Sequence, residues 1–183
     1  MNFVATNLEG CFVLEPKIIK DERGYFMESF NENTFQKALG IKTHFVQDNQ
    51  SFSSKGVLRG LHYQVGDHAQ SKLVRVLTGE ILDVAVDIRP NSTTFGNYFS
   101  IVLSAENQKQ LFVPAGFAHG FLVLSETATL FYKCDNFYHK ESEGGIIFND
   151  PTLNINWGEK SENCIISEKD KNLPLFKNAK KIW

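Results

Sequence analysis

The stretch that decides the fold is Val57-Leu58-Arg59-Gly60-Leu61-His62-Tyr63-Gln64, continued by Ser71-Lys72-Leu73-Val74-Arg75-Val76-Leu77. Apolar and β-branched residues alternate with polar ones in both segments, which predicts two β-strands. The joining residues include Gly66-Asp67, a pair that favours a tight connection, so we expect a hairpin. Arg59, His62, Gln64 and Lys72 stand among apolar neighbours, where polar groups are costly to bury unless they are paired. They predict a polar pocket in an apolar barrel.

Other short strands follow from the same period of two. Residues 81–88 place Leu82, Val84, Val86 and Ile88 on one face and Asp83 and Asp87 on the other. Further strands are predicted at residues 10–14, 17–19, 25–30, 98–103, 111–113, 121–124 and 128–134, and residues 45–52 are predicted to be a strand end that runs into a polar loop. Short strands at a spacing of about 8–12 residues are typical of an all-β sandwich or barrel.

Two non-strand elements interrupt this pattern in the first two thirds of the chain. Residues 31–40 predict a helix, because Asn31 or Asn33 can cap its start and Gly40 can end it. Residues 114–120, which begin Pro114-Ala115-Gly116, predict a turn. Beyond residue 140 the pattern weakens into loops, and a helix start is expected at Ser167.

Composition limits the class of protein. The 183 residues predict one domain over 1–183, and the formal net charge of -2 shows no basic patch of the kind that binds nucleic acid. No apolar run is long enough to span a membrane, and the first residues lack a secretory pattern. Cys11, Cys134 and Cys164 form neither a zinc pair nor a disulfide framework, which favours a reducing compartment, the cytoplasm. The 16 Phe residues predict a wide β-core or a dimer interface.

His62 is the first candidate for chemistry. A single histidine in a strand is usually structural, but Arg59 and Lys72 on the expected hairpin favour a functional role. Strict alternation places Arg59 and His62 on opposite faces of the strand. A bulge at Gly60 would bring them to the same face, since glycine within a strand often marks one.

Tyr132 and Asp170 each have two interpretations. Alternation places Tyr132 on the inward face with Ala128, Leu130 and Cys134, either as a core tyrosine or as a catalytic acid. Ser167-x-x-Asp170 matches a capping box, and a carboxylate there would matter for catalysis only if the fold brought it to a histidine.

His119 raises the question of a metal. Pro114-x-Gly116-x-x-His119 resembles the second motif of cupin barrels, many of which bind metal through His-x-His and a carboxylate. The residue two after His62 is Gln64, so that spacing fails here. Asp67 and His68 are the substitutes that could still hold iron, manganese or zinc.

Six motifs together resemble the dTDP-4-dehydrorhamnose 3,5-epimerase family, in order and over nearly the whole chain. They are Asp21-Glu22-Arg23-Gly24, Phe45-Val46-Gln47-Asp48-Asn49, the segment 56–64, Lys72-Leu73-Val74-Arg75-Val76, the segment 114–121 and Ile166-Ser167-Glu168-Lys169-Asp170. The resemblance implies a metal-free, cupin-like double-stranded β-helix (jelly-roll) barrel with a few short helices, and a homodimer. The family pattern leads us to expect glycine before Lys72, but this chain has Ser71 there. The serine should add a hydroxyl near the pocket.

The resemblance also implies the chemistry. The substrate would be dTDP-4-dehydro-6-deoxy-D-glucose, whose C4 ketone can delocalise the enolate formed at C3 or C5, without a cofactor. His62 would be the base, Asp170 its partner, Tyr132 the acid and Lys72 the enolate-stabilising cation. The residues implied around the nucleotide-sugar are Arg23, Glu28, Gln47, Asp48, Asn49, Arg59, Lys72, His119, Glu143 and Lys169, with Tyr138 stacking on the thymine. Arg23 and Glu28 lie on an N-terminal arm that can reach a neighbouring subunit.

Three other hypotheses about the function stay open. A 3-epimerase or 5-epimerase acting on a related 4-keto nucleotide-sugar is the nearest one. A metal-dependent cupin oxygenase would lose activity on chelation, and a non-catalytic sugar-nucleotide binder would exchange no protons.

Overall fold

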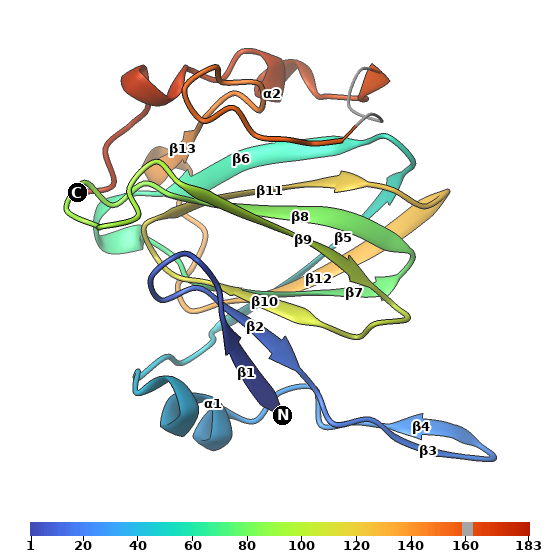
Figure 1. The fold of residues 1–183 in the computed structure, drawn as a ribbon. Coiled ribbons are helices and arrows are strands. Elements are labelled where there is room, and N and C mark those ends of the chain that lie inside the picture. Colours follow the sequence, from blue (N-terminus) through green and yellow to red (C-terminus); the bar gives the residue numbers. More distant parts are fainter. Residues whose placement is uncertain (159–162) are drawn as a thin grey trace.

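A computed structural model describes residues 1–158 and 163–183 and shows two antiparallel sheets packed face to face (Figure 1). The first sheet has the order β1 (Asn2–Ala5), β2 (Phe12–Glu15), β10 (Gln110–Val113), β7 (Lys72–Thr78), β12 (Thr127–Cys134) and β5 (Gln47–Ser54). The second has the order β13 (Glu143–Gly145), β6 (Leu58–Gln64), β11 (Phe117–Val123), β8 (Glu80–Asp87) and β9 (Tyr98–Ser104). The predicted all-β, cupin-like jelly-roll barrel is confirmed.

Smaller elements lie around the barrel. A separate hairpin, β3 (Ile19–Asp21) and β4 (Gly24–Phe26), projects away from it (Figure 1). The predicted helix is α1 (Glu32–Leu39), with Asn31 as its N-cap and Gly40 in the left-handed conformation at its end. The short helix α2 (Glu168–Lys171) and 3₁₀ turns at Gly66–His68, Lys140–Ser142 and Phe176–Asn178 complete the set. None of the helices in the described ranges is long and apolar enough to cross a membrane.

The expected hairpin is wrong, and its correction matters for the site. β6 and β7 are consecutive in the chain but belong to different sheets, so they face each other across the barrel. The connection contains a 3₁₀ turn, Gly66–His68, and is longer than the two-residue loop that favours direct pairing. His62 and Lys72 therefore approach the interior from opposite walls.

The expected turn over residues 114–120 is also wrong in its second half. Strand β11 begins at Phe117, so His119 stands on a strand in the middle of its sheet. All seven residues of β11 are buried, because both faces of this sheet are covered, and the polar–apolar alternation that marks a half-exposed strand is absent. Two short strands, β1 and β13, carry too little pattern to be predicted, and residues 27–30 are not part of β4.

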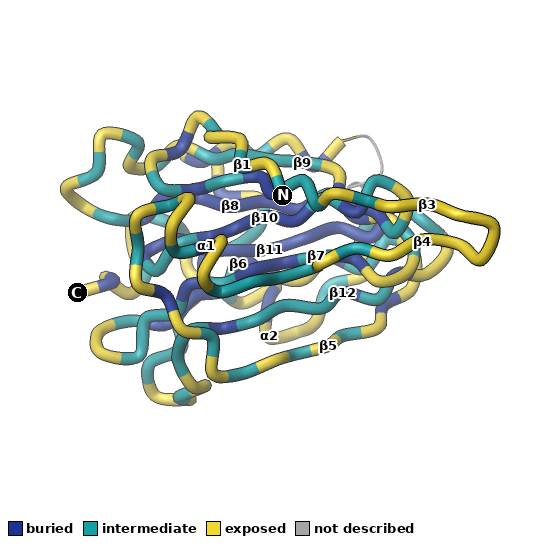
Figure 2. Tube along the Cα trace, turned by 90° about the horizontal axis from the view of Figure 1, so that it is seen from below, coloured by how far each residue is buried: buried dark blue, intermediate teal, exposed yellow. Residues whose placement is uncertain are grey.

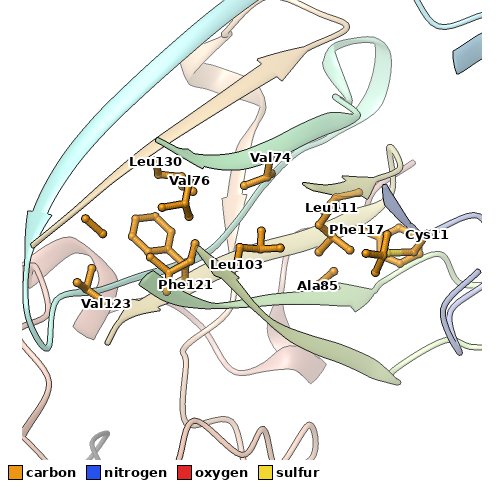
Figure 3. Close-up of a cluster of buried hydrophobic side chains, with 14 of the residues drawn as sticks. Cys11, Val74, Val76, Ala85, Leu103, Leu111, Phe117, Phe121, Val123 and Leu130 are labelled. Atoms are coloured by element: carbon orange, nitrogen blue, oxygen red, sulfur yellow. The ribbon is translucent and has the colours of Figure 1, made fainter. Parts of the chain in front are cut away.

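The interior between the sheets is the main core. Its buried residues come from both walls and include Val74 and Leu130 from one sheet and Ala85 and Phe121 from the other (Figure 3). A second cluster lies on the opposite face of β6, β8 and β11 and includes Trp157 and Ile182 of the C-terminal segment. The central strands are accordingly the most buried part of the chain, whereas the β3–β4 hairpin is exposed throughout (Figure 2).

A bulge at Gly60 is confirmed. His119 pairs with His62 and Phe121 pairs with Arg59. Between these two pairs β6 therefore contains one residue more than β11. Gly60 has a φ of +123°, and a Cβ there would lie 2.6 Å from Gly120 Cα and 2.9 Å from the His119 carbonyl oxygen. Only glycine fits this crossing, which turns Arg59 and His62 toward one cavity.

Candidate active site

Two adjoining cavities open between the sheets. The outer one, of about 370 Å³, is lined by Gln47, Asn49, His62, Tyr63, Gln64, Gln70, Lys72, Tyr132, Tyr138 and Glu143. The inner one, of about 200 Å³, is lined by Ser51, Arg59, His62, Lys72, His119, Gly120, Phe121, Leu130 and Tyr132. His62, Lys72 and Tyr132 belong to both, so they mark the point where the cavities meet.

His62 is paired with Asp170, a residue 108 positions away in the chain. The Nε2 atom of His62 lies 2.7 Å from Asp170 Oδ1, and Asp170 Oδ2 accepts a hydrogen bond of 3.1 Å from the Gly60 N–H. Backbone hydrogen bonds between Ile165 and residues 56 and 58 hold the C-terminal segment against β6, and Ser167 caps α2, which carries Asp170. Ser167 therefore caps the helix while the Asp170 side chain is used elsewhere.

This pairing sets the state of both groups. Burial alone would raise the pKa of Asp170, but the hydrogen bond and the charge of His62 and the Gly60 N–H leave it below its usual range. A charged Asp170 accepts Nε2–H, so Nδ1 is the nitrogen that can take a proton. Within the described part of the chain, Nδ1 of His62 has no hydrogen-bond partner.

Lys72 and Tyr132 come from the opposite wall. Lys72 Nζ lies 5.9 Å from the centroid of the Tyr132 ring and makes no hydrogen bond or ion pair with any described residue. Burial lowers the pKa of Lys72, while Cys134, Asp83 and Glu143 act in the opposite direction. Burial also raises the pKa of Tyr132, so its hydroxyl keeps its proton at neutral pH. The predicted inward face of β12 is confirmed, since Ala128, Leu130 and Cys134 are all buried.

His119, which lines the inner cavity, forms a second histidine–carboxylate pair. His119 Nε2 lies 2.8 Å from Asp83 Oδ1, and both residues are buried. Arg59 reaches the same cavity, where its Nε donates to the Ser53 Oγ at 3.1 Å. The residue that sequence reasoning missed here is Asp83. Its signal was the alternation of β8, which places two acidic residues on a face that also carries Ile81 and Ala85.

The mouth of the outer cavity gathers the other predicted contacts. Gln47 donates to Asn49 Oδ1 at 3.0 Å and accepts the Tyr138 N–H at 3.0 Å, which ties the loop carrying Tyr138 to β5. Lys169 Nζ and Glu143 Oε1 form an ion pair of 2.6 Å beside His62. Tyr138 is exposed and presents its ring at the opening.

Three predicted residues lie away from the site, and in this chain their side chains pair with residues that line neither cavity. The Asp48 side chain points away from them and pairs with Lys133 at 2.9 Å, because β5 alternates and only residues 47, 49 and 51 face inward. Arg23 is exposed on the β3–β4 hairpin and pairs with Asp21. Glu28 accepts a 3.2 Å hydrogen bond from Asn31 near α1.

Ser71 and Gln64 have structural contacts. The Ser71 hydroxyl accepts the Ala115 N–H at 3.1 Å, so the hydroxyl expected near the pocket is not part of the lining of either cavity. Gln64 donates to the carbonyl groups of His68 and Phe137, and its Oε1 accepts the His139 N–H at 2.6 Å. Over residues 1–158 and 163–183 no group of three or more His, Cys, Asp or Glu side chains is arranged to hold a metal ion.

Comparison with known proteins bears on this geometry. The family model described as dTDP-4-dehydrorhamnose 3,5-epimerase matches residues 5–178. The chain belongs to this family. A crystal structure of dTDP-4-dehydrorhamnose 3,5-epimerase from Elizabethkingia anophelis is similar to it with 56% identity and a TM-score of 0.95, covering 100% of this chain and 99% of the other.

Two further members carry bound nucleotide-sugars. The dTDP-6-deoxy-D-glucose-3,5-epimerase of Legionella pneumophila, in complex with dTDP-4-keto-L-rhamnose, is 50% identical over 97% of this chain and 93% of its own, with a TM-score of 0.91. ChmJ, a 3'-monoepimerase from Streptomyces bikiniensis in complex with dTDP-quinovose, is 33% identical over 95% of this chain and 87% of its own, with a TM-score of 0.89. The fold thus serves both double and single epimerases.

Proposed function

We propose that this chain is an isomerase of dTDP-L-rhamnose biosynthesis, which converts dTDP-4-dehydro-6-deoxy-D-glucose into dTDP-4-dehydro-L-rhamnose. Both inverted carbons, C3 and C5, lie beside the C4 ketone. Removing either proton gives an enolate whose charge moves onto the ketone oxygen, so the substrate supplies its own electron sink. The reaction as proposed draws on no nicotinamide, metal or pyridoxal.

One observation carries the proposal: His62 and Tyr132 face one cavity from opposite sheets. Inversion needs a base on one face of the sugar ring and an acid on the other. His62 takes the proton through Nδ1, and Asp170 stabilises the imidazolium that forms. Tyr132, whose hydroxyl keeps its proton because burial raises its pKa, returns a proton from the far side. Lys72, adjacent to both, places its ammonium by the developing enolate oxygen.

The nucleotide extends from Arg59 in the inner cavity through the outer cavity toward solvent. Arg59 is the candidate for a bidentate contact to the diphosphate, and the exposed ring of Tyr138 can stack on the thymine. Gln47, Asn49, Glu143 and Lys169 line the path between, with the polar atoms that a deoxyribose and phosphates require. His119 contacts the sugar in the inner cavity.

Inversion at both carbons rests on similarity, since the Elizabethkingia and Legionella relatives named as 3,5-epimerases are nearer in sequence than the 3'-monoepimerase. The test is the product formed from the 4-keto-6-deoxyglucose nucleotide by protein dialysed against a chelator, with the configuration at each carbon read by NMR. We expect inversion at both carbons. Inversion at C3 alone would identify a mono-epimerase, and activity that returns only with added metal would overturn the mechanism.

We further propose that the enzyme is a homodimer. Phe26 is 69% exposed on the β3–β4 hairpin, and Ile19 and Tyr25 beside it are also exposed. An isolated two-stranded hairpin is marginally stable in water, and a cluster of exposed aromatic residues marks an interface. On β5, which is the edge strand of its sheet, Phe52 is 63% exposed. In the dimer the hairpin would bring Arg23 and Glu28 to the partner's cavity.

Mixed dimers test this arrangement. Arg23→Ala and His62→Ala subunits, refolded together, should regain about one working site in four, because half of the dimers are mixed and each has one intact site. Each variant refolded alone is the control. A monomer in light scattering would contradict the dimer. Cys11 and Cys134 are buried and form no disulfide, which suits a reducing compartment, and the cytoplasm remains the proposed location.

A further inference from the structure

His119, which lines the inner cavity, pairs with the carboxylate of Asp83, and the reaction as described assigns this pair no proton transfer. His119 on β11 and His62 on β6 are direct partners in the same sheet, and each turns Nε2 toward a carboxylate. The two carboxylates differ in their contacts. Asp170 uses both oxygens, whereas Asp83 uses one: its Oδ2 is buried and has no hydrogen-bond partner in the described residues.

A buried carboxylate oxygen without a partner is costly unless a nearby cation offsets the charge. Asp83 is fully buried, at 0% exposure, on the interior face of β8. His119 meets it directly at 2.8 Å and lines the inner cavity together with Lys72, whose pKa the charge of Asp83 raises against the larger effect of burial. Lys72 has no ion pair or hydrogen bond with any described residue, so its ammonium and the Asp83 Oδ2 atom both lack a partner there.

We infer that Asp83 is a positioning residue for the proposed epimerisation, which fixes His119 through Nε2 and supplies the negative charge that keeps Lys72 an ammonium. The inference rests on the proposed function of the site. Asp83 would keep Lys72 protonated before the substrate binds, so that the ammonium is already present when the enolate forms. Its effect belongs to the transition state, where the oxygen becomes negative, rather than to ground-state binding.

Other groups around Lys72 define what the charge of Asp83 must add. The titratable and charged side chains around it are Cys134 and Tyr132 on β12, Asp83 on β8, Glu143 on β13, Arg59 and His62 on β6, and His119 on β11. Glu143 is already held by Lys169, and Asp170 by His62. Burial raises the pKa of Cys134, so the thiol stays neutral at the pH of catalysis. Asp83 is therefore the carboxylate near Lys72 whose second oxygen has no hydrogen-bond partner among the described residues.

The tautomer of His119 reports the charge of Asp83, and it can be measured without an activity assay. A charged carboxylate accepts a proton from Nε2–H, whereas a neutral carboxyl group donates its own proton to a bare Nε2. ¹⁵N NMR of the parent protein at neutral pH should show His119 protonated at Nε2. A bare Nε2 with the proton on Nδ1 would mean that Asp83 is neutral, and the inference would be overturned whether or not the protein epimerises.

The pH profile of Asp83→Asn gives the second readout. Asparagine can still accept Nε2–H but carries no charge, so Lys72 should lose its proton at lower pH. We expect the basic limb of the kcat profile to move down by about one pH unit, and KM at the pH optimum to change by less than about threefold. The matched control is Asp87→Asn, which removes a second fully buried carboxylate from the same face of β8.

The two variants separate positioning from structure. Asp83 contacts His119 of the cavity lining, whereas Asp87 is bonded to Arg89, Ser92 and Thr94, none of which lines either cavity. The Asp87 variant should therefore lose thermal stability and keep the parent profile. If the basic limb of Asp83→Asn stays where the parent has it, Asp83 has only a structural role. If Asp83→Asn fails to fold, the His119 tautomer in the parent protein still decides.

Discussion

Asp87 and Asp83 lie four residues apart on β8 and are both fully buried, yet their surroundings differ. Asp87, at the end of β8, accepts hydrogen bonds from Arg89, Ser92 and Thr94, and the Arg89 guanidinium lies 4.8 Å from the Phe117 ring centroid. By contrast, Asp83 Oδ2 has no partner among the described residues, and neither have Lys72 Nζ and His62 Nδ1. Buried polar groups are normally satisfied by the protein itself. Lys72 and His62 line the cavities, so their unsatisfied atoms are available to a substrate, whereas Asp83 lies outside the lining.

The largest effect should come from removing the base. His62→Ala leaves no group on its face of the cavity to take a proton, so we expect kcat to fall about 10³-fold, within the range typical of positioned proton transfer. The loss should not be rescued by more substrate, and deuterium uptake should stop at both carbons. Exchange at C3 or C5 near the parent rate would show that another group is the base.

A somewhat smaller loss is expected when the partner of the base is changed. In Asp170→Asn one amide must face both His62 Nε2–H and the Gly60 N–H, and its NH₂ group cannot accept from either. We expect kcat to fall about 10²-fold while KM changes little, since the imidazolium is no longer stabilised. A variant with the parent kcat would make Asp170 a purely structural residue.

At Asp87 the same substitution should affect stability alone. Asp87→Asn removes the charge from a buried ion pair, which we expect to cost about 3 kcal/mol and to lower Tm by roughly 10 °C. Calorimetry measures this loss, and kcat should stay within about twofold of the parent. An unchanged Tm would show that the folded state does not depend on this ion pair.

The pH dependence of that loss has a definite sign. Burial alone would raise the pKa of Asp87, but its hydrogen bonds to Arg89, Ser92 and Thr94 leave it below its usual range. A lowered folded-state pKa contributes stability that is complete above the unfolded value, about 3.9, and is lost as pH falls through the folded value. The stability difference between parent and Asp87→Asn should therefore be constant from pH 5 to 7 and shrink below about pH 4.

The smallest effect is expected at Ser71, the residue before Lys72 in the chain. Ser71→Gly removes the hydroxyl that accepts the Ala115 N–H and should cost about 1 kcal/mol of stability. Because the hydroxyl lies outside both cavities, kcat and KM should stay near the parent values. A KM change above about threefold would return the hydroxyl to the substrate site.

Local pattern predicted much of the strand content and the helix α1, since period-two alternation and capping residues are local signals. The bulge at Gly60 could also be predicted, because Arg59 and His62 otherwise face opposite ways. The assignment of β6 and β7 to different sheets could not be predicted, since the pairing of a strand depends on which other strands of the barrel lie beside it. The first half of β11 was predicted as a turn for a related reason. The strand is buried on both faces, so its sequence shows no polar–apolar alternation.

The site shows the same division. Inward alternation of β12 identified Tyr132, but the alternative of a core tyrosine stayed open until the cavity was seen. Asp170 reaches His62 from 108 residues away, which motif resemblance implied and spacing alone did not. Asp83 was visible as one of two acidic residues on β8. Only the structure distinguishes the one that is fully bonded from the one that is not.

The central claim is that base and acid act from opposite sheets, and Tyr132→Phe in heavy water tests it most directly. The variant keeps the ring and removes the hydroxyl, so His62 can still abstract a proton while nothing returns one from the far face. NMR should show deuterium entering the recovered substrate at unchanged configuration, with little inverted product. Inversion of both carbons at nearly the parent rate would contradict the account and make Tyr132 a core residue.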